Sequence, residues 1–184
     1  KKRAYLREAH NRYMRPIVHK QWRYPNDNFD SHTYPKGAVI LNTLRWIMGD
    51  EAFQRSISHY LHKHAFQPVG THDFMKAIKE ATGQNMDWFI EQWILRPGHP
   101  VFDVSYDWDE TAKKLTLSVR QTQDTSGDIP VYRTPVLFGV HTTTGKTFKK
   151  FWIEEKEEIF EMEVDSKPLM VRFDEGNFLL KEWT

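Results

Sequence analysis

Tyr34 is the side chain whose surroundings best suit chemistry, because it stands where a polar stretch meets an apolar run. Residues 31–50 read SHTYPKGAVILNTLRWIMGD. A tyrosine of the core would be expected further inside the run, whereas this one can face a cleft. A phenol stays protonated at neutral pH and donates a hydrogen bond, so it could stabilise the oxyanion of an acyl-transfer reaction. From the residues alone, a packed loop tyrosine is the more ordinary interpretation.

Three histidines in the stretch HYLHKH, residues 59–64, are the other candidates. His59 and His62 are three residues apart on one helix face, so they could share a metal ion. No carboxylate follows them at helical spacing, and His-Glu-x-x-His is absent from the chain. Surface histidines at a helix end are therefore the favoured interpretation, and we predict no metal ligand among residues 1–184.

Several other chemistries are excluded by what the sequence lacks. There is no cysteine, which rules out disulfides, thiolate metal sites and cysteine nucleophiles. There is also no glycine-rich phosphate loop, no Gly-x-Gly-x-x-Gly and no Gly-x-Ser-x-Gly elbow. We therefore expect no bound cofactor in this chain.

Helices must position the candidates in the first half of the chain. Apolar residues at spacings of three and four predict helices over 3–14, 35–48, 50–61, 71–82 and 86–95, with a loop over 21–33. Pro35 suits the first turn of its helix, where its missing N–H costs nothing. Asp50 and Thr71 suit N-caps, and Gly49 and Gly83 suit helix ends.

Beyond residues 97–100 the apolar period changes from 3.6 to 2. Alternating runs over 102–108, 115–121, 136–140, 160–164 and 169–173 are separated by turn residues, which indicates about seven short strands. The predicted fold class is therefore α+β with two domains. Residues 1–98 form the helical domain, and residues 99–184 form an antiparallel, immunoglobulin-like β-sandwich.

Composition and charge limit the partners. The 184 residues carry a net charge of +1 and are 39% hydrophobic, as in an ordinary globular protein. Residues 1–30 contain eight Lys and Arg and could contact nucleic acid or a membrane surface, but a solvated helix face is favoured. No apolar stretch reaches the roughly 18 residues of a membrane span. We expect no nucleic-acid partner and no membrane span; neither the compartment nor the oligomeric state follows from the sequence.

The order of short motifs resembles the aminopeptidase N-like zinc metallopeptidases, also called gluzincin aminopeptidases. The family pattern runs Tyr-x-Lys-Gly-Ala, an apolar helix, Leu-Gly-x-x-x-Phe, Tyr-Leu, Thr-x-Asp-Phe, Trp and Gly-x-Pro. Its counterparts here are Tyr34, Lys36, Gly37 and Ala38; Met48, Gly49 and Phe53; Tyr60 and Leu61; Thr71, Asp73 and Phe74; Trp93; and Gly98 and Pro100. The resemblance spans residues 5–105, and the β segment matches in position and class.

The resemblance implies a role for Tyr34. In that family this tyrosine is catalytic and stabilises the tetrahedral intermediate formed when zinc-activated water attacks a peptide carbonyl. It also implies that residues 1–98 are the end of a thermolysin-like catalytic domain and that the substrates are peptides with free N-termini. The family's Glu after the tyrosine is Pro35 here, which could change the angle at which the phenol enters the cleft.

The chain departs from the family in lacking the zinc helix, the third ligand Glu and the Gly-x-Met-Glu-Asn loop, all of which normally precede the tyrosine. The resemblance therefore implies a fragment of a zinc aminopeptidase that is inactive alone, with zinc held by the full-length parent. The alternative is a non-catalytic scaffold on the same fold. An intact upstream zinc motif would favour the enzyme, as does retention of Tyr34.

Overall fold

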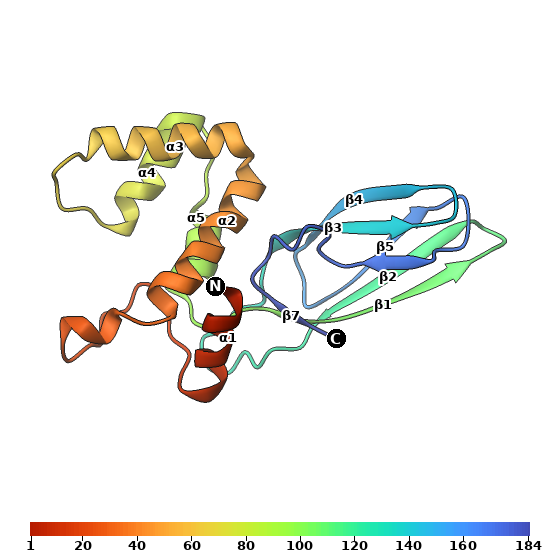
Figure 1. Ribbon diagram of the computed structural model, residues 1–184, viewed down its shortest axis with the longest axis horizontal. Coiled ribbons are helices and arrows are strands. Elements are labelled where there is room, and N and C mark those ends of the chain that lie inside the picture. The colour runs from red at the N-terminus through yellow and green to blue at the C-terminus, as the bar shows by residue number, and fades with distance from the viewer. The chain divides into compact units, whose positions relative to one another are not determined.

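A computed structural model describes all 184 residues, which divide into two compact units, residues 1–97 and 98–184. The first unit is helical (Figure 1). Its elements are α1 (Lys2–Asn11), η1 (Pro25–Asn28), η2 (His32–Lys36), α2 (Gly37–Met48), α3 (Asp50–Lys63), α4 (Thr71–Thr82), α5 (Asp87–Ile90) and η3 (Glu91–Leu95). Of these, η1 is a 3₁₀ turn, whereas η2 and η3 are π-helical turns.

The apolar stripes of these helices form the core of the first unit. Helices α3 and α4 lie side by side (Figure 1), and the Tyr60 and Phe74 rings meet edge to face at 5.4 Å between centroids. The aromatic segment formed by α5 and η3 turns its large side chains inward, since Phe89 and Trp93 are fully buried. Burial of each such ring stabilises the fold by a few kcal/mol.

Helix ends differ from the expected positions by one or a few residues. The N-cap of α3 is Gly49 and that of α4 is Gly70, so Asp50 and Thr71 are first helical residues rather than caps. Asp73 supplies the missing side-chain cap by accepting the Gly70 N–H at 2.8 Å. Gly83 ends α4 in the left-handed conformation at φ 72°, as its position predicted.

The second unit consists of seven strands in two sheets (Figure 1). The strands are β1 (Val101–Asp109), β2 (Lys114–Gln121), β3 (Thr134–His141), β4 (Lys146–Ile153), β5 (Glu157–Glu163), β6 (Met170–Arg172) and β7 (Glu182–Trp183). One sheet has the order β5-β2-β1-β7 and the other β4-β3-β6. The α+β class is confirmed, but β7 pairs parallel with β1, so the first sheet is mixed rather than wholly antiparallel.

Aromatic side chains connect the two sheets. Phe102 of β1 meets Phe173, which follows β6, at 5.0 Å between centroids, and Phe151 of β4 stacks on Phe160 of β5 at 4.6 Å. The alternating pattern of apolar and polar residues predicted these strands. Its apolar side chains point inward and fill the space between the two sheets. No helix of the chain has both the length and the apolar character that a bilayer crossing requires.

Candidate functional site

Tyr34 lies on the η2 turn and presents its phenol to solvent. The residue is 58% exposed, and its hydroxyl has no hydrogen-bond partner among the residues of the chain. The neighbouring ring of Phe29, itself exposed, lies 5.8 Å away between centroids. The phenol is therefore a free donor at the surface and not a packed loop residue, whereas its facing a substrate cleft stays a prediction.

The expectation that Pro35 opens the helix is wrong, because the turn already begins at His32 and α2 begins at Gly37. Proline cannot donate a backbone hydrogen bond, so the helical ladder is interrupted at Pro35. The Tyr34 N–H still bonds Asp30 O four residues back at 3.3 Å, whereas the Lys36 N–H bonds Ser31 O five residues back at 2.8 Å. This extra residue in the turn is the π-type distortion that often marks functional sites.

Asp30 fixes the start of that turn. Its Oδ1 accepts the N–H groups of His32 and Thr33, both at 3.0 Å. Arg15 donates two hydrogen bonds to the same carboxylate, from Nε at 2.9 Å and from Nη2 at 2.7 Å. The Tyr13 hydroxyl also donates to Oδ2, at 3.0 Å. The turn that carries Tyr34 is therefore held by a bidentate ion pair whose two side chains are largely buried.

The charge state of this bracing pair follows from its contacts. Burial works to raise the pKa of Asp30, but hydrogen bonds from the Thr33 backbone, Arg15 and Tyr13 outweigh it and hold that pKa below its ordinary value. Burial, followed by the Asp30 carboxylate, raises the pKa of Tyr13. The carboxylate is therefore charged, and the Tyr13 phenol protonated, throughout the neutral range.

Lys36 and His32 are fully buried on the inner side of the same turn. Burial, and to a smaller extent the positive charge of Arg15, lowers the pKa of Lys36 to about 7. Burial is also the main reason that the pKa of His32 is lowered, so its ring is neutral at pH 7. Tyr5 contacts both groups, with its ring 5.3 Å from the His32 ring and 5.4 Å from Lys36 Nζ.

The two histidines on α3 do not form a metal site. His59 Nε2 lies 2.8 Å from Glu80 Oε2, and Lys63 Nζ bonds the same carboxylate. His62 instead contacts the carbonyl of Ser58 through Nδ1 at 2.7 Å. The hydrogen bond from Lys63, and then that from His59, lowers the pKa of Glu80 to about 2. The group is a surface ion-pair network between α3 and α4.

A possible ligand set in the first unit also fails as a zinc site. Ligand atoms of Glu8, Asp30 and His32 lie within 4.8 Å of one another. Asp30, however, is occupied by Arg15, and Glu8 accepts the Ser31 N–H and an Arg12 hydrogen bond, both at 2.8 Å. A metal ion would have to displace a guanidinium from its bidentate partner, so these residues do not fit zinc.

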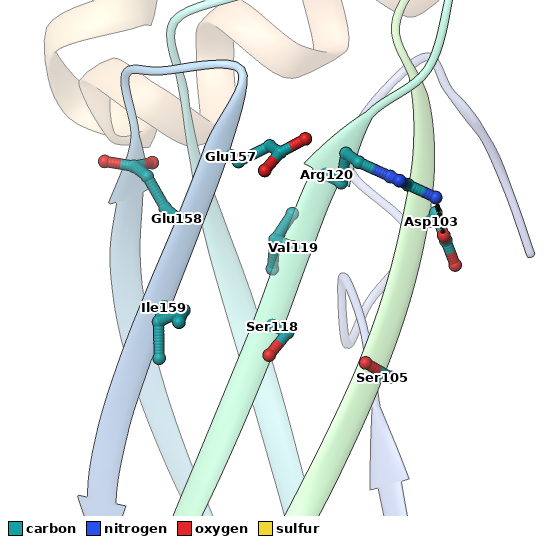
Figure 2. A pocket seen from close by; sticks show the side chains of 8 residues that line it. All are labelled: Asp103, Ser105, Ser118, Val119, Arg120, Glu157, Glu158 and Ile159. Atoms are coloured by element: carbon teal, nitrogen blue, oxygen red, sulfur yellow. Dashed lines mark hydrogen bonds and ion pairs between the residues drawn. The ribbon is translucent and has the colours of Figure 1, made fainter.

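The second unit carries a shallow depression on β1, β2 and β5, shown in Figure 2. Ser105 and Ser118 lie opposite each other across β1 and β2. Arg120 forms an ion pair with Asp103 at 2.7 Å. The lining contains no histidine or lysine, and neither serine is hydrogen-bonded to the carboxylates there, so the depression holds no nucleophile paired with a base.

Sequence reasoning singled out Tyr34 but missed Asp30 and Arg15, which hold its turn. A signal was present, since Asp30 stands three residues before Thr33, the spacing at which an Asp side chain caps a helical start. Arg15 gave no such signal, because fifteen residues separate it from its partner.

Comparison with known proteins identifies the family. The description "Peptidase family M1 domain" matches residues 2–93, half of the chain, and the chain therefore belongs to peptidase family M1. Its relatives include the "Probable aminopeptidase 1" of Sulfurisphaera tokodaii, 32% identical over 113 residues that cover 61% of this chain and 14% of that protein. The "Aminopeptidase N" of Lactococcus lactis subsp. lactis is 35% identical over 88 residues, covering 46% and 10%.

A solved structure supports the fold over almost the whole chain. The structure described as Legionella pneumophila aminopeptidase A in complex with aspartic acid is similar, with a TM-score of 0.78 and 17% sequence identity. The match covers 97% of this chain and 21% of that protein. The chain thus spans about a fifth or less of the length of these proteins, and the similarity of structure concerns the fold alone.

Proposed function

We propose that residues 1–184 are part of a zinc-dependent aminopeptidase, called the parent below, that removes N-terminal residues from peptides. Membership of peptidase family M1 and the aminopeptidase names of the relatives support this proposal. Zinc would be held by parent residues outside 1–184, because His-Glu-x-x-His is absent from residues 1–184 and the carboxylates of Glu8 and Asp30 are already engaged by other groups. Residues 1–184 alone are then inactive.

The observation that carries the proposal is the unpartnered Tyr34 hydroxyl on a braced turn. When a peptide carbonyl is attacked, its oxygen gains negative charge, and a fixed O–H donor stabilises that charge without having to reorganise. The phenol is exposed and available, and the ion pair between Asp30 and Arg15 fixes the backbone on which it stands. Tyr34 is therefore proposed as the oxyanion donor.

The proposal is tested by expressing the parent gene and residues 1–184 separately and assaying both with an aminoacyl 4-nitroanilide. We expect turnover by the parent, its loss on treatment with a chelator, recovery with zinc, and no turnover by residues 1–184. Zinc-dependent turnover by residues 1–184 alone would refute the proposal that the zinc site lies outside these residues. A parent without peptidase activity would instead favour the non-catalytic scaffold.

A further inference from the structure

Strands β4 and β5 are the edge strands on one side of the β-sandwich. The sheet orders β4-β3-β6 and β5-β2-β1-β7 give each of them a neighbouring strand on one side only. The two edges lie close together, because only residues 154–156 connect them and Phe151 of β4 stacks on Phe160 of β5. An edge strand presents backbone N–H and C=O groups that can pair with a strand of another molecule.

The two edges carry opposite charges. Strand β4 has the sequence KTFKKFWI, with lysines and no acid, and β5 has the sequence EEIFEME, with glutamates and no base. Lys114 of β2 pairs with Glu161 at 2.7 Å, but the other glutamates keep the β5 edge acidic. Like charges therefore oppose the pairing of two β4 edges or of two β5 edges, whereas a β4 edge attracts a β5 edge.

The hydrogen-bond pattern shows which residues of β4 turn their backbone groups to the open side. The Thr142 N–H bonds Gly145 O, and the next pair along the register is His141 with Lys146. Hydrogen-bonded pairs alternate with other pairs along an antiparallel ladder. The residues of β4 whose backbone groups point away from β3 are therefore Lys146, Phe148, Lys150 and Trp152. Their side chains share the outer face, since the alternating Phe151 packs between the sheets.

The same reasoning applies to β5. The Gln121 N–H bonds Lys156 O at 2.7 Å, which is a hydrogen-bonded pair at one end of the ladder between β2 and β5. The Val164 N–H bonds Lys113 O at 3.0 Å at the other end. The residues of β5 whose backbone groups point away from β2 are therefore Glu157, Ile159, Glu161 and Glu163. Their side chains also face outward, because the alternating Phe160 points between the sheets.

We propose that β4 of one copy of the chain pairs antiparallel with β5 of a second copy. One register places complementary outward residues opposite each other: Lys146 and Glu161, Phe148 and Ile159, and Lys150 and Glu157. On the other face of the new ladder, the same register places Lys149 opposite Glu158. A shift of two residues in either direction leaves at most one charge pair, so the sequence favours this register.

Two exposed apolar side chains support the pairing. Phe148 is 52% exposed and Ile159 is 68% exposed, each among charged neighbours on its strand. In the proposed register each covers the other, which removes apolar surface from water. The contact joins different edges of the two copies, so association can continue beyond two copies. The proposal goes beyond the peptidase function and does not depend on it.

Charge reversal on the two edges tests the pairing by sedimentation velocity of residues 1–184. We expect larger species whose share rises with concentration and falls when NaCl is raised from about 0.05 M to about 0.5 M. The double variant Lys146→Glu with Lys150→Glu should weaken the association at least about tenfold, because attraction becomes repulsion at two pairs. The double variant Glu157→Lys with Glu161→Lys should do the same. A mixture of the two should associate again, since an acidic β4 then meets a basic β5.

The matched control is Lys76→Glu with Lys79→Glu, which makes the same change of charge at exposed positions of α4. This control should associate as the wild type does, and circular dichroism establishes that each variant is folded. A control that loses association as the edge variants do would overturn the proposal, because total charge rather than the edges would then be responsible.

Disulfide formation tests the register without charge reversal, since the chain has no cysteine. Phe148→Cys in one copy and Ile159→Cys in another should form a mixed disulfide, because a hydrogen-bonded antiparallel pair brings its Cα atoms to about 5.5 Å. Phe148→Cys mixed with Glu163→Cys is the control, because four residues displace the thiol by about 13 Å along the strand. Equal yields of mixed disulfide from the two mixtures would overturn the register.

Three results in sedimentation would overturn the pairing itself. The first is a wild-type chain that stays a single copy at every concentration. The second is association that persists unchanged in both folded edge variants, because it would then arise elsewhere, such as in the helical unit. The third is a mixture of the folded edge variants that does not associate. None of these results depends on peptidase activity, so the proposed function is tested separately.

Discussion

Replacing Lys36 by methionine should stabilise residues 1–184 near neutral pH, by an amount that shrinks as the pH rises. The amine has no acceptor in this chain, and burial lowers its pKa from 10.5 to about 7. The Lys36 amine is therefore protonated less readily in the folded state than in the unfolded chain. Methionine keeps the apolar stem and removes the titrating group.

The magnitude follows from the pKa of Lys36. Between pH 7 and pH 10.5 the folded amine is mostly neutral while the unfolded amine is charged. The unfolded state then binds about one more proton, so the free energy of unfolding of the wild type rises with pH by about 1.4 kcal/mol per pH unit. The lysine's penalty is fully present below pH 7 and absent above pH 10.5. The advantage of Lys36→Met should fall by about 3–4 kcal/mol between pH 7 and pH 10.

Guanidinium unfolding of both proteins at half-unit pH steps measures this difference, with circular dichroism at 222 nm to follow the helical unit. Taking the difference between the two proteins cancels all other groups that titrate in the same range. Lys79→Met, which removes an exposed lysine of α4, is measured beside them as the control. A stability difference between Lys36→Met and wild type that stays constant from pH 7 to pH 10 would refute the reasoning, because the amine would then titrate normally in the folded protein.

Three further predictions concern stability. Asp30→Ala should destabilise the helical unit by about 3–5 kcal/mol, since it leaves Arg15 buried without its partner; a loss below about 1 kcal/mol in chemical unfolding would contradict the bracing role. Because the pKa of Asp30 is lowered in the folded state, the stabilisation that its carboxylate provides should be complete above its unfolded pKa of about 4. This stabilisation should be lost as the pH falls through the pKa of Asp30 in the folded protein, so an acid-unfolding midpoint shared by wild type and Asp30→Asn would contradict the prediction. Asp174→Ala should destabilise the β unit by about 3–5 kcal/mol, because it leaves Lys181, which pairs with Asp174 in the interior, without its partner; a thermal unfolding midpoint by near-UV circular dichroism equal to that of the wild type would contradict it.

Much of the fold could be predicted because the apolar period reports local geometry directly. The change from period 3.6 to period 2 near residues 97–100 separates helices from strands in the structure as well. Strand β4, by contrast, was not among the predicted runs. Its sequence, KTFKKFWI, has exposed lysines at an edge of its sheet, so the alternation is weak.

The chemistry of the site was only partly accessible to sequence reasoning. Tyr34 stands out because its neighbours change abruptly from polar to apolar. The ion pair between Arg15 and Asp30 depends on tertiary folding and leaves no periodic trace. The burial of Lys36 runs against its usual preference for the surface, and only the packing around Tyr5 reveals it.

The most direct test of the account is Tyr34→Phe in the zinc-loaded parent, beside Tyr24→Phe as the control. Both tyrosines are 58% exposed, so each variant removes one surface hydroxyl at the same exposure. We predict that Tyr34→Phe lowers kcat by about 10²–10³ without changing Tm, and that Tyr24→Phe behaves as wild type. Full kcat in Tyr34→Phe would contradict the assignment of Tyr34 as the oxyanion donor.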